Sequence, residues 1–367
     1  MTEPAEKPKR RTRYRGSHPQ QFAEKYKEHD PTRFVEDVAK VLASGKTPAG
    51  THRPIMVREI MQVLAPQPGN FAVDCTLGYG GHARELLTAV QPGGRLLAID
   101  ADPIELPKTE ARLRVLGFPP ESLIARRSNF AGATQLIAAE SPEGADVLLA
   151  DLGLSSMQID DPARGFTFKS DGPLDMRMNP SRGMSAAAML AKIDAQKLTT
   201  LLGDNADEPR AAAFATAILQ AQSRHPLCTT QALAEVVRVA FARLPQTSDE
   251  QADDAVRRVF QALRIEVNDE FGALDTLLRN LPHCLKPGGR VAILTFHSGE
   301  DRRVKLALKQ GLRDDLYSTI ADDVMRPSAE EKRANPRSSS AKLRYAVRTN
   351  NLDHLSPVKL DPGTPEA

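Results

Sequence analysis

A glycine-rich stretch after an apolar run is the first feature of the sequence that could do chemistry. From Phe71 the chain reads Phe-Ala-Val-Asp-Cys-Thr-Leu-Gly-Tyr-Gly-Gly-His, which predicts a strand, a loop and the start of a helix. Glycines let the backbone adopt positive φ and approach a ligand closely, and the N-terminus of a helix offers unpaired N–H groups. We therefore expect Gly78, Gly80 and Gly81 to line a ligand site.

Acidic and aromatic residues follow the later apolar runs. Asp100 ends the run that starts at Arg95, a position from which a carboxylate can accept hydrogen bonds from both hydroxyls of an adenosine ribose. Phe130 follows a third run and could pack on the adenine ring, and Asp151 follows a fourth. Open α/β sheets bind ligands at the carboxyl ends of their strands. These side chains are therefore predicted to share one site with the glycine loop.

The spacing of the glycine loop indicates the type of ligand. Gly-x-Gly-Gly-His is neither the Gly-x-Gly-x-x-Gly that fits a pyrophosphate nor a Gly-Lys-Ser/Thr phosphate loop. Asp74, just before the loop, would repel a phosphate and attract an ammonium or sulfonium group. The residues favour S-adenosylmethionine as the cofactor, and they leave an NAD-dependent oxidoreductase open as the alternative.

Strand-like runs that alternate with helical segments would position this site. Near-continuous apolar strands separated by helices predict a parallel sheet covered on both faces, an α/β Rossmann-like fold. The predicted strands are 71–75, 95–99, 122–125, 146–150 and 290–296, and the predicted helices are 82–90, 104–116, 131–139 and 300–309. The run 342–348 alternates apolar and polar residues and is predicted to be a late edge strand.

A long segment without strand-like runs interrupts this alternation. It contains helical periods at 185–202, 210–221 and 230–243, followed by one long helix with apolar residues from Val256 to Leu281. We therefore expect an all-helical domain inserted into the sheet domain.

Composition limits the classes of function. The 367 residues carry 49 Lys and Arg against 47 Asp and Glu, a net charge of +2 that excludes a uniformly basic nucleic-acid coat. Local basic segments at 7–15 and 326–348 remain candidates for phosphate contacts. Cys75, Cys228 and Cys284 lack metal-ligand spacing, so no metal site is expected, and a reducing cytoplasmic compartment is favoured. No apolar run approaches the length of a membrane span, so no membrane association is expected.

Several long motifs in order resemble the bacterial MraW family, the ribosomal small-subunit methyltransferase H enzymes. They are Thr-His-Arg-Pro-Ile-Met-Val-Arg-Glu from 51, Asp-Cys-Thr-Leu-Gly-Tyr-Gly-Gly-His from 74, Ile-Asp-Ala-Asp-Pro from 99, Asp-Leu-Gly-Leu-Ser-Ser-Met-Gln-Ile-Asp-Asp-Pro-Ala-Arg-Gly-Phe-Thr-Phe from 151, Phe-Gln-Ala-Leu-Arg-Ile-Glu-Val-Asn from 260, Thr-Phe-His-Ser-Gly-Glu-Asp-Arg from 295 and Asn-Pro-Arg-Ser-Ser-Ser-Ala-Lys-Leu-Arg from 335. The resemblance implies a class I methyltransferase sheet and methylation of N4 of a decoding-site cytidine in 16S rRNA. The substrate could be naked rRNA or the small ribosomal subunit, and a methyltransferase for a different RNA is the alternative.

The resemblance also implies site residues and domain limits. The cofactor residues it implies are Gly80, Gly81, His82, Asp100, Phe130, Asp151 and Gln158, of which Gln158 has no support from the residues alone. We expect a basic, largely disordered extension at 1–50, the methyltransferase domain at 51–160 and 258–350, an inserted helical RNA-recognition domain at 161–257 and a flexible tail at 351–367. The sequence leaves the oligomeric state open.

Methylation of an exocyclic amine needs no covalent nucleophile, but it needs an acceptor for the amine proton. Asp151, at the end of the fourth strand, is the best candidate for this acceptor. His297, at the end of the fifth strand, could take a proton or anchor its loop. Phe166 and Phe168 could stack on an unstacked base or close the inserted domain.

Overall fold

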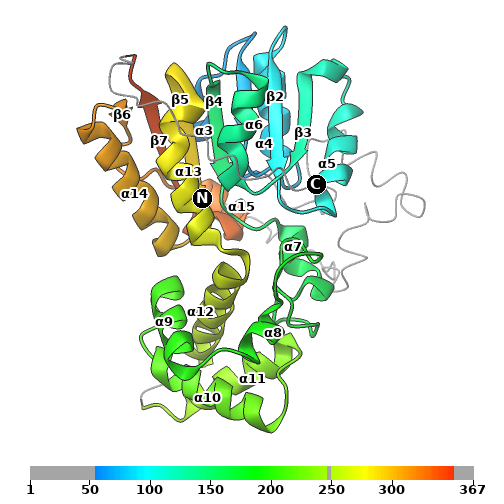
Figure 1. Ribbon diagram of the computed structural model, residues 1–367, viewed down its shortest axis with the longest axis vertical. Coiled ribbons are helices and arrows are strands. Elements are labelled where there is room, and N and C mark those ends of the chain that lie inside the picture. Colours follow the sequence, from blue (N-terminus) through cyan, green and yellow to red (C-terminus); the bar gives the residue numbers. More distant parts are fainter. Residues whose placement is uncertain (1–53, 246–248, 351–367) are drawn as a thin grey trace, which may run out of the picture. The chain divides into compact units, whose positions relative to one another are not determined.

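The computed structural model describes residues 54–245 and 249–350 (Figure 1). The extension at 1–50, its basic segment 7–15 and the tail at 351–367 lie outside the described residues. Among the described residues no helix is both long and apolar enough to cross a lipid bilayer.

The described strands form one seven-stranded sheet in the order β3-β2-β1-β4-β5-β7-β6. Their bounds are β1 Phe71–Asp74, β2 Arg95–Asp100, β3 Leu123–Arg127, β4 Ala145–Asp151, β5 Leu285–Thr295, β6 Tyr317–Ile320 and β7 Lys342–Arg348. Strands β1 to β5 pair in parallel, and β7 pairs antiparallel to both β5 and β6. The chain reverses its direction across the sheet between β1 and β4, and open α/β sheets bind ligands at the carboxyl ends of the strands at such a point. This arrangement confirms the predicted class I methyltransferase sheet.

Strand β7 differs from its prediction as an edge strand. It lies between β5 and β6, with Val347 opposite Arg290 on one side and Thr319 on the other. The edge strand on this side of the sheet is β6, which the sequence did not reveal because Tyr317-Ser-Thr-Ile is short and mostly polar. Such short polar edges limit unwanted pairing with other chains.

Within the described residues, six helices cover the two faces of the sheet (Figure 1). On one face α3 (Val57–Leu64), α4 (Gly81–Val90) and α5 (Glu105–Arg114) share a hydrophobic cluster with strand residues such as Ala72. On the other face α6 (Ala133–Glu140), α13 (Glu270–Cys284) and α14 (Ser298–Arg313) pack with residues such as Val73. Neighbouring residues of a strand point to opposite faces, so nearly continuous apolar strands serve both clusters. Two short helices, α7 (Ser156–Asp160) and α15 (Ala329–Ala334), lie in the connections.

The segment between β4 and β5 is helical and has its own hydrophobic cluster, in which Phe214 and Phe241 stack with ring centroids 6.5 Å apart. Its helices are α8 (Ala186–Leu190), α9 (Ala195–Ala206), α10 (Ala211–Arg224), α11 (Thr230–Ala242) and α12 (Asp249–Asn268). Residues of α12 up to Leu263 belong to this cluster.

Two predicted helices are each divided in the structure. The helix expected at 185–202 is split because the Asp194 side chain accepts the N–H of Lys197 at 2.8 Å and starts a new helix, α9. The long helix expected from Val256 to Leu281 is broken at Asp269, whose φ of 48° is left-handed and separates α12 from α13. Helical periodicity continued across both breaks and concealed them.

Candidate active site

Asp100 holds the glycine loop at the carboxyl end of the sheet. Its Oδ2 accepts the N–H of Gly78 at 2.7 Å and its Oδ1 accepts the N–H of Asp102 at 2.8 Å. Burial raises the pKa of Asp100 to about 6. Each carboxylate oxygen retains a second lone pair, so the side chain can still accept hydrogen bonds from two ribose hydroxyls.

Two of the loop glycines, Gly80 and Gly81, are needed because a side chain would collide with neighbouring residues. Gly80 has a φ of 84°, and a Cβ there would lie 2.8 Å from Cγ2 of Thr109. A Cβ on Gly81 would lie 2.9 Å from Cγ of Pro54. Gly78 has a φ of 49° but its Cβ position is open, so this residue leaves space beside the loop. The structure therefore gives Gly80 and Gly81 a steric role that spacing alone did not predict.

Buried polar atoms without hydrogen bonds collect beside this loop. Asp74, 1% exposed, accepts the N–H of Thr76 through Oδ1, but its Oδ2 makes no hydrogen bond within the described residues. The buried His82 Nε2 is likewise without a hydrogen bond among them, and it lies 3.6 Å from Oδ2 of Asp151. Burial raises the pKa of Asp74 to about 6. Orphaned acceptors of this kind fit a cationic ligand group, such as the ammonium or sulfonium of S-adenosylmethionine.

Asp151 is the last residue of β4, at the same end of the sheet. Its backbone N–H donates to Oγ1 of Thr76 at 2.7 Å, and its Oδ1 accepts the N–H of Gly153 at 3.2 Å. The side chain is 23% exposed, so the carboxylate remains accessible from outside the sheet. Asp74, His82, Asp100 and Asp151 thus converge at the ends of β1, β2 and β4.

Gln158 lies in this region, but its side-chain amide is engaged by the protein. Its Nε2 donates to Oδ2 of Asp102 at 2.8 Å, and its Oε1 accepts the N–H of Ser155 at 3.0 Å. The cofactor contact that the resemblance implies for Gln158 stays a prediction. Phe130 begins a short turn after β3, is partly buried and packs against the sheet cluster, so its ring is positioned beside the end of the sheet.

Asp102 and Arg164 were not predicted as site residues. Arg164 Nη1 lies 2.8 Å from Oδ2 of Asp102, and their side chains are 9% and 0% exposed. A signal for Asp102 was present in the sequence, because Asp102-Pro-Ile-Glu is a typical helix-start pattern. Its Oδ1 indeed accepts the N–H groups of Ile104 and Glu105 at 2.9 and 3.3 Å.

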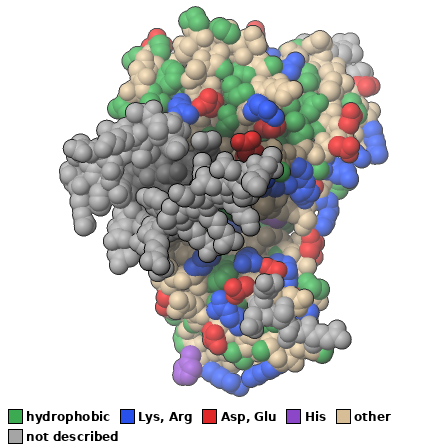
Figure 2. Space-filling model, turned by 180° about the vertical axis from the view of Figure 1, so that it is seen from behind, with side chains coloured by type: hydrophobic (Ala, Val, Ile, Leu, Met, Phe, Trp, Pro, Cys, Tyr) green, Lys and Arg blue, Asp and Glu red, His purple; other side chains and the backbone are tan. Residues whose placement is uncertain are grey.

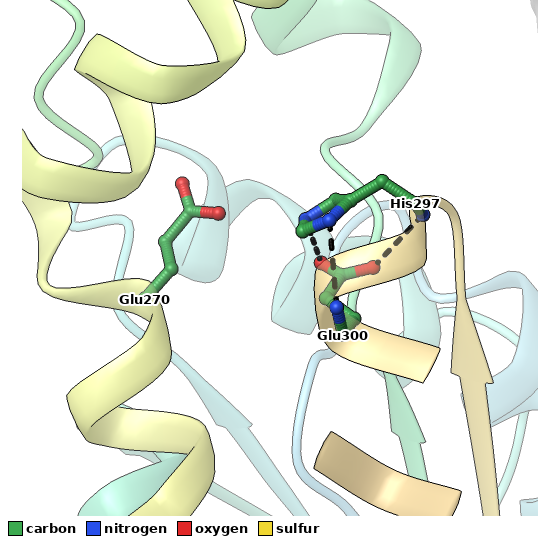
Figure 3. Close-up of side chains that lie close together, drawn as sticks. All are labelled: Glu270, His297 and Glu300. Carbon is green, nitrogen blue, oxygen red and sulfur yellow. Dashed lines mark hydrogen bonds and ion pairs between the residues drawn. The ribbon is translucent and has the colours of Figure 1, made fainter. Parts of the chain in front are cut away.

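His297 begins α14 as a capping residue (Figure 3). Its Nδ1 accepts the N–H of Glu300 at 3.4 Å, and its Nε2 lies 3.0 Å from Oε1 of Glu300. A neutral ring that accepts through Nδ1 carries its proton on Nε2. Neither nitrogen of that tautomer is a free base, so the geometry favours an anchoring role. The catalytic role of His297 remains a prediction.

Glu270, His297 and Glu300 offer ligand atoms within 4.8 Å of one another, a spacing that a metal ion could use (Figure 3). Two features oppose metal binding. Ligation through Nε2 would require the other tautomer of the ring, whose Nδ1 cannot accept the Glu300 N–H. Glu270 already forms two 2.8 Å hydrogen bonds with Arg264. These contacts favour a helix cap at His297 and an ion pair at Glu270 over a metal centre.

Phe166 and Phe168 both pack within the helical segment. Phe166 is 9% exposed in its hydrophobic cluster. The Phe168 ring lies edge-on to Phe260 with centroids 5.3 Å apart. These contacts favour the interpretation that the two rings close the helical segment.

Much of the basic segment 326–348 is neutralised within the fold. Arg337 pairs with Asp160 at 2.7 Å, and Lys342 and Arg344 both pair with Asp301. On the face drawn in Figure 2, basic and acidic side chains are interspersed outside the grey atoms, in keeping with a net charge of +2. This segment therefore offers less free positive charge than its composition predicted.

A sheet of this order, with a glycine loop and acidic residues at the ends of β1, β2 and β4, defines a class I methyltransferase. The chain belongs to the MraW methylase family, which it matches over residues 49–349. This membership confirms the resemblance, the enzyme class and S-adenosylmethionine as the methyl donor. The NAD-dependent alternative is thereby set aside.

Curated relatives agree with this assignment. The chain is 47% identical over 342 residues to ribosomal RNA small subunit methyltransferase H 1 of Lachnoclostridium phytofermentans, with 93% of each chain covered. It is 48% identical to ribosomal RNA small subunit methyltransferase H 2 of Alkaliphilus metalliredigens, covering 94% of this chain and 98% of that one. A match to the solved structure of an S-adenosylmethionine-dependent O-methyltransferase from Thermotoga maritima covers 86% of this chain and 71% of that one, at 10% identity and a TM-score of 0.37.

Proposed function

We propose that this protein transfers the methyl group of S-adenosylmethionine to N4 of a decoding-site cytidine in 16S rRNA. The observation that carries the proposal is the accessible carboxylate of Asp151 beside the orphaned polar atoms of Asp74 and His82. The relatives named as ribosomal RNA small subunit methyltransferase H support rRNA as the substrate class.

In the proposed mechanism, bound S-adenosylmethionine supplies an electrophilic methyl group on a sulfonium. Asp74 balances the positive charge of the donor, and Asp100 holds the ribose. Asp151 accepts a hydrogen bond from the cytosine amine and orients its lone pair toward the methyl carbon. When the sulfonium methyl group passes to the amine nitrogen, the carboxylate of Asp151 would receive the amine proton.

We infer that the helical segment at 161–257, together with the rest of α12, recognises the RNA. It joins the sheet through Asp207, which accepts a 2.6 Å hydrogen bond from Ser298 and pairs with Arg302 at 3.2 Å. Ser298 and Arg302 belong to the helix that starts at the carboxyl end of β5. The proposed partner is 16S rRNA within the small ribosomal subunit, in the cytoplasm.

Mass mapping of rRNA from cells that lack this protein tests the proposal. We expect the N4 methyl group to be absent from one decoding-site cytidine and to return when the purified protein and S-adenosylmethionine are added to small subunits. A lost methyl group on a different RNA would overturn the substrate assignment but leave the methyltransferase class intact.

A further inference from the structure

We propose that Asp102 and Arg164 are positioning residues that couple cofactor binding to RNA binding. The proposal deepens the function proposed above and rests on it. Neither side chain is placed in contact with the reacting atoms. Both act through the segments that their hydrogen bonds hold together.

The pair is buried, so its geometry is well defined. Arg164 Nη1 lies 2.8 Å from Asp102 Oδ2, and the two side chains are 9% and 0% exposed. A buried ion pair is weak evidence for stability, because desolvation offsets much of the attraction between the charges. A buried ion pair does fix the positions of the groups that hydrogen-bond to it. The groups that hydrogen-bond to Asp102 and Arg164 come from three segments of the chain.

The first segment is the cofactor loop. The N–H of Asp102 donates to Oδ1 of Asp100 at 2.8 Å, while Oδ2 of Asp100 accepts the N–H of Gly78 at 2.7 Å. Asp102 is therefore one hydrogen bond away from the carboxylate expected to hold the ribose. A ligand that orders Asp100 also orders the backbone that carries Asp102.

The second segment follows β4, where Asp151 lies. Gln158 donates its Nε2 to Oδ2 of Asp102 at 2.8 Å, the same oxygen that pairs with Arg164. Gln158 also accepts the N–H of Ser155 through Oε1 at 3.0 Å. The loop that carries the proposed proton acceptor is thus held by the same carboxylate.

The third segment leads to the helical region. Arg164 Nη2 donates to the carbonyl oxygen of Met178 at 2.7 Å. The N–H of Met178 donates to Oδ1 of Asn268 at 2.7 Å, and Asn268 Nδ2 donates to the carbonyl oxygen of Met176 at 2.8 Å. Asn268 is the last residue of α12. The chain of hydrogen bonds therefore runs from Gly78 to the end of the helical segment.

Coupling between two sites requires an element whose arrangement both ligands bias. The Asp102–Arg164 pair is placed to be this element, because Asp100, at one end of the hydrogen-bonded chain, is expected to hold the ribose and the proposed RNA-binding segment forms the other end. By linkage, occupancy of the cofactor site should raise RNA affinity and bound RNA should raise cofactor affinity by the same factor.

The test compares binding of S-adenosylhomocysteine, which cannot donate a methyl group, with and without saturating small subunits from cells lacking the enzyme. We expect the native protein to bind it more tightly with subunits, within the range of about 5-fold to 150-fold typical of such coupling. The coupling ratio is the dissociation constant of S-adenosylhomocysteine without subunits divided by the one with subunits. Arg164→Lys keeps the charge but loses the planar fork, so this coupling ratio should move toward one. Its kcat should fall by about tenfold or more, while the dissociation constant without RNA stays near the native value.

Arg95→Lys is the matched control, because it makes the same exchange at the end of the sheet away from the site. Arg95 begins β2, and its Nη2 donates to the carbonyl oxygen of Glu140 at 2.6 Å. This control loses the same planar fork but should keep the coupling ratio. If Arg164→Lys does not fold, Asp102→Asn, which keeps the side-chain shape, is measured in its place.

Three outcomes overturn the inference. The first is a coupling ratio of one in the native protein, and the second is an unchanged coupling ratio and kcat in the folded Arg164 or Asp102 variant. The third is an equal fall of the coupling ratio in the control variant. Failure of the function proposed above is distinct. In that case the native protein itself would neither methylate nor bind small subunits.

Discussion

The carboxylate of Asp100 accepts the backbone N–H of Gly78 at 2.7 Å, so one side chain both shapes the glycine loop and faces the expected ribose. This double role links loop geometry to cofactor affinity. It also means that substitutions of Asp100 remove two kinds of interaction at once.

Asp100→Ala should weaken S-adenosylmethionine binding roughly tenfold to hundredfold, the equivalent of about 1.5–3 kcal/mol for charge-assisted hydrogen bonds. Calorimetric titration measures the dissociation constant of S-adenosylmethionine. Asp100→Asn keeps one acceptor for the Gly78 N–H and should lose less. An unchanged constant in a folded Ala variant would refute the ribose assignment.

The buried carboxyl of Asp74 should make the cofactor-free protein sensitive to pH. Burial raises its pKa from 3.8 to about 6, so the folded state holds this proton more tightly than the unfolded state. Stability without cofactor should therefore fall as pH rises from about 4 to about 6, by up to about 3 kcal/mol. Cofactor affinity should change in the opposite direction, since a cationic group prefers the ionised carboxylate.

Asp74→Asn separates these two effects. The amide retains an acceptor for the Thr76 N–H but carries no charge. Thermal unfolding at pH 7.5 should show that the cofactor-free variant is more stable than the native protein and is stabilised less by S-adenosylmethionine. The stability difference between the two cofactor-free proteins should shrink toward pH 4. A variant that binds the cofactor as tightly as the native protein would show that Asp74 does not balance its charge.

Asp151→Ala should abolish methyl transfer, since it removes the proposed proton acceptor at the end of β4. The fold should persist, because the side chain is 23% exposed and the backbone N–H still reaches Thr76. Single-turnover methylation of small subunits, with circular dichroism as the folding control, measures both quantities. Near-normal turnover would mean that another group receives the proton.

His297→Asn tests whether the histidine acts as a cap or as a base. Asparagine is a strong N-cap residue, so this variant should fold like the native protein and retain turnover. His297→Ala should lose about 1 kcal/mol of stability because the Glu300 N–H loses its acceptor. An equal loss of turnover in the folded Asn and Ala variants would indicate that His297, and not Asp151, accepts the amine proton.

Helix α14 presents a row of exposed basic residues at 302, 305, 309 and 313, spaced to share one face. Lys305, Lys309 and Arg313 have no ion pair within the described part of the chain. Changing these three to Glu should weaken binding to small subunits and reduce its salt dependence, without affecting cofactor affinity. Arg114→Glu, on an exposed helix at the opposite face of the sheet, is the control. Equal salt dependence in the triple variant and the native protein would exclude α14 as a phosphate contact.

Local sequence patterns predicted the central strands of the sheet and the end of the sheet that carries the glycine loop. Continuous apolar runs located five strands, and the glycine loop with Asp100 located the cofactor end of the sheet. Strand β6 was missed because pairing with β7, a distant segment, stabilises it more than its own residues do. The breaks at Asp194 and Asp269 were missed because helical periodicity continues across them.

The site was predicted less completely for the same reason. The partners of Asp102 and Gln158 come from other segments, and sequence spacing does not contain such contacts. The basic segment 326–348 looked free because its acidic partners, Asp160 and Asp301, lie elsewhere in the chain. Burial of Asp74, and hence its raised pKa, likewise follows from tertiary packing.

Strands β4 and β5 are neighbours in the sheet, with Asp151 opposite Leu294, although the whole helical segment lies between them in the chain. Their pairing must close a very long loop, whereas the contacts within the helical segment are local and form faster. During synthesis the first four strands emerge without the neighbour that covers β4. We therefore expect the edge of β4 to stay unpaired until β5 has been made, and an unpaired strand edge favours aggregation.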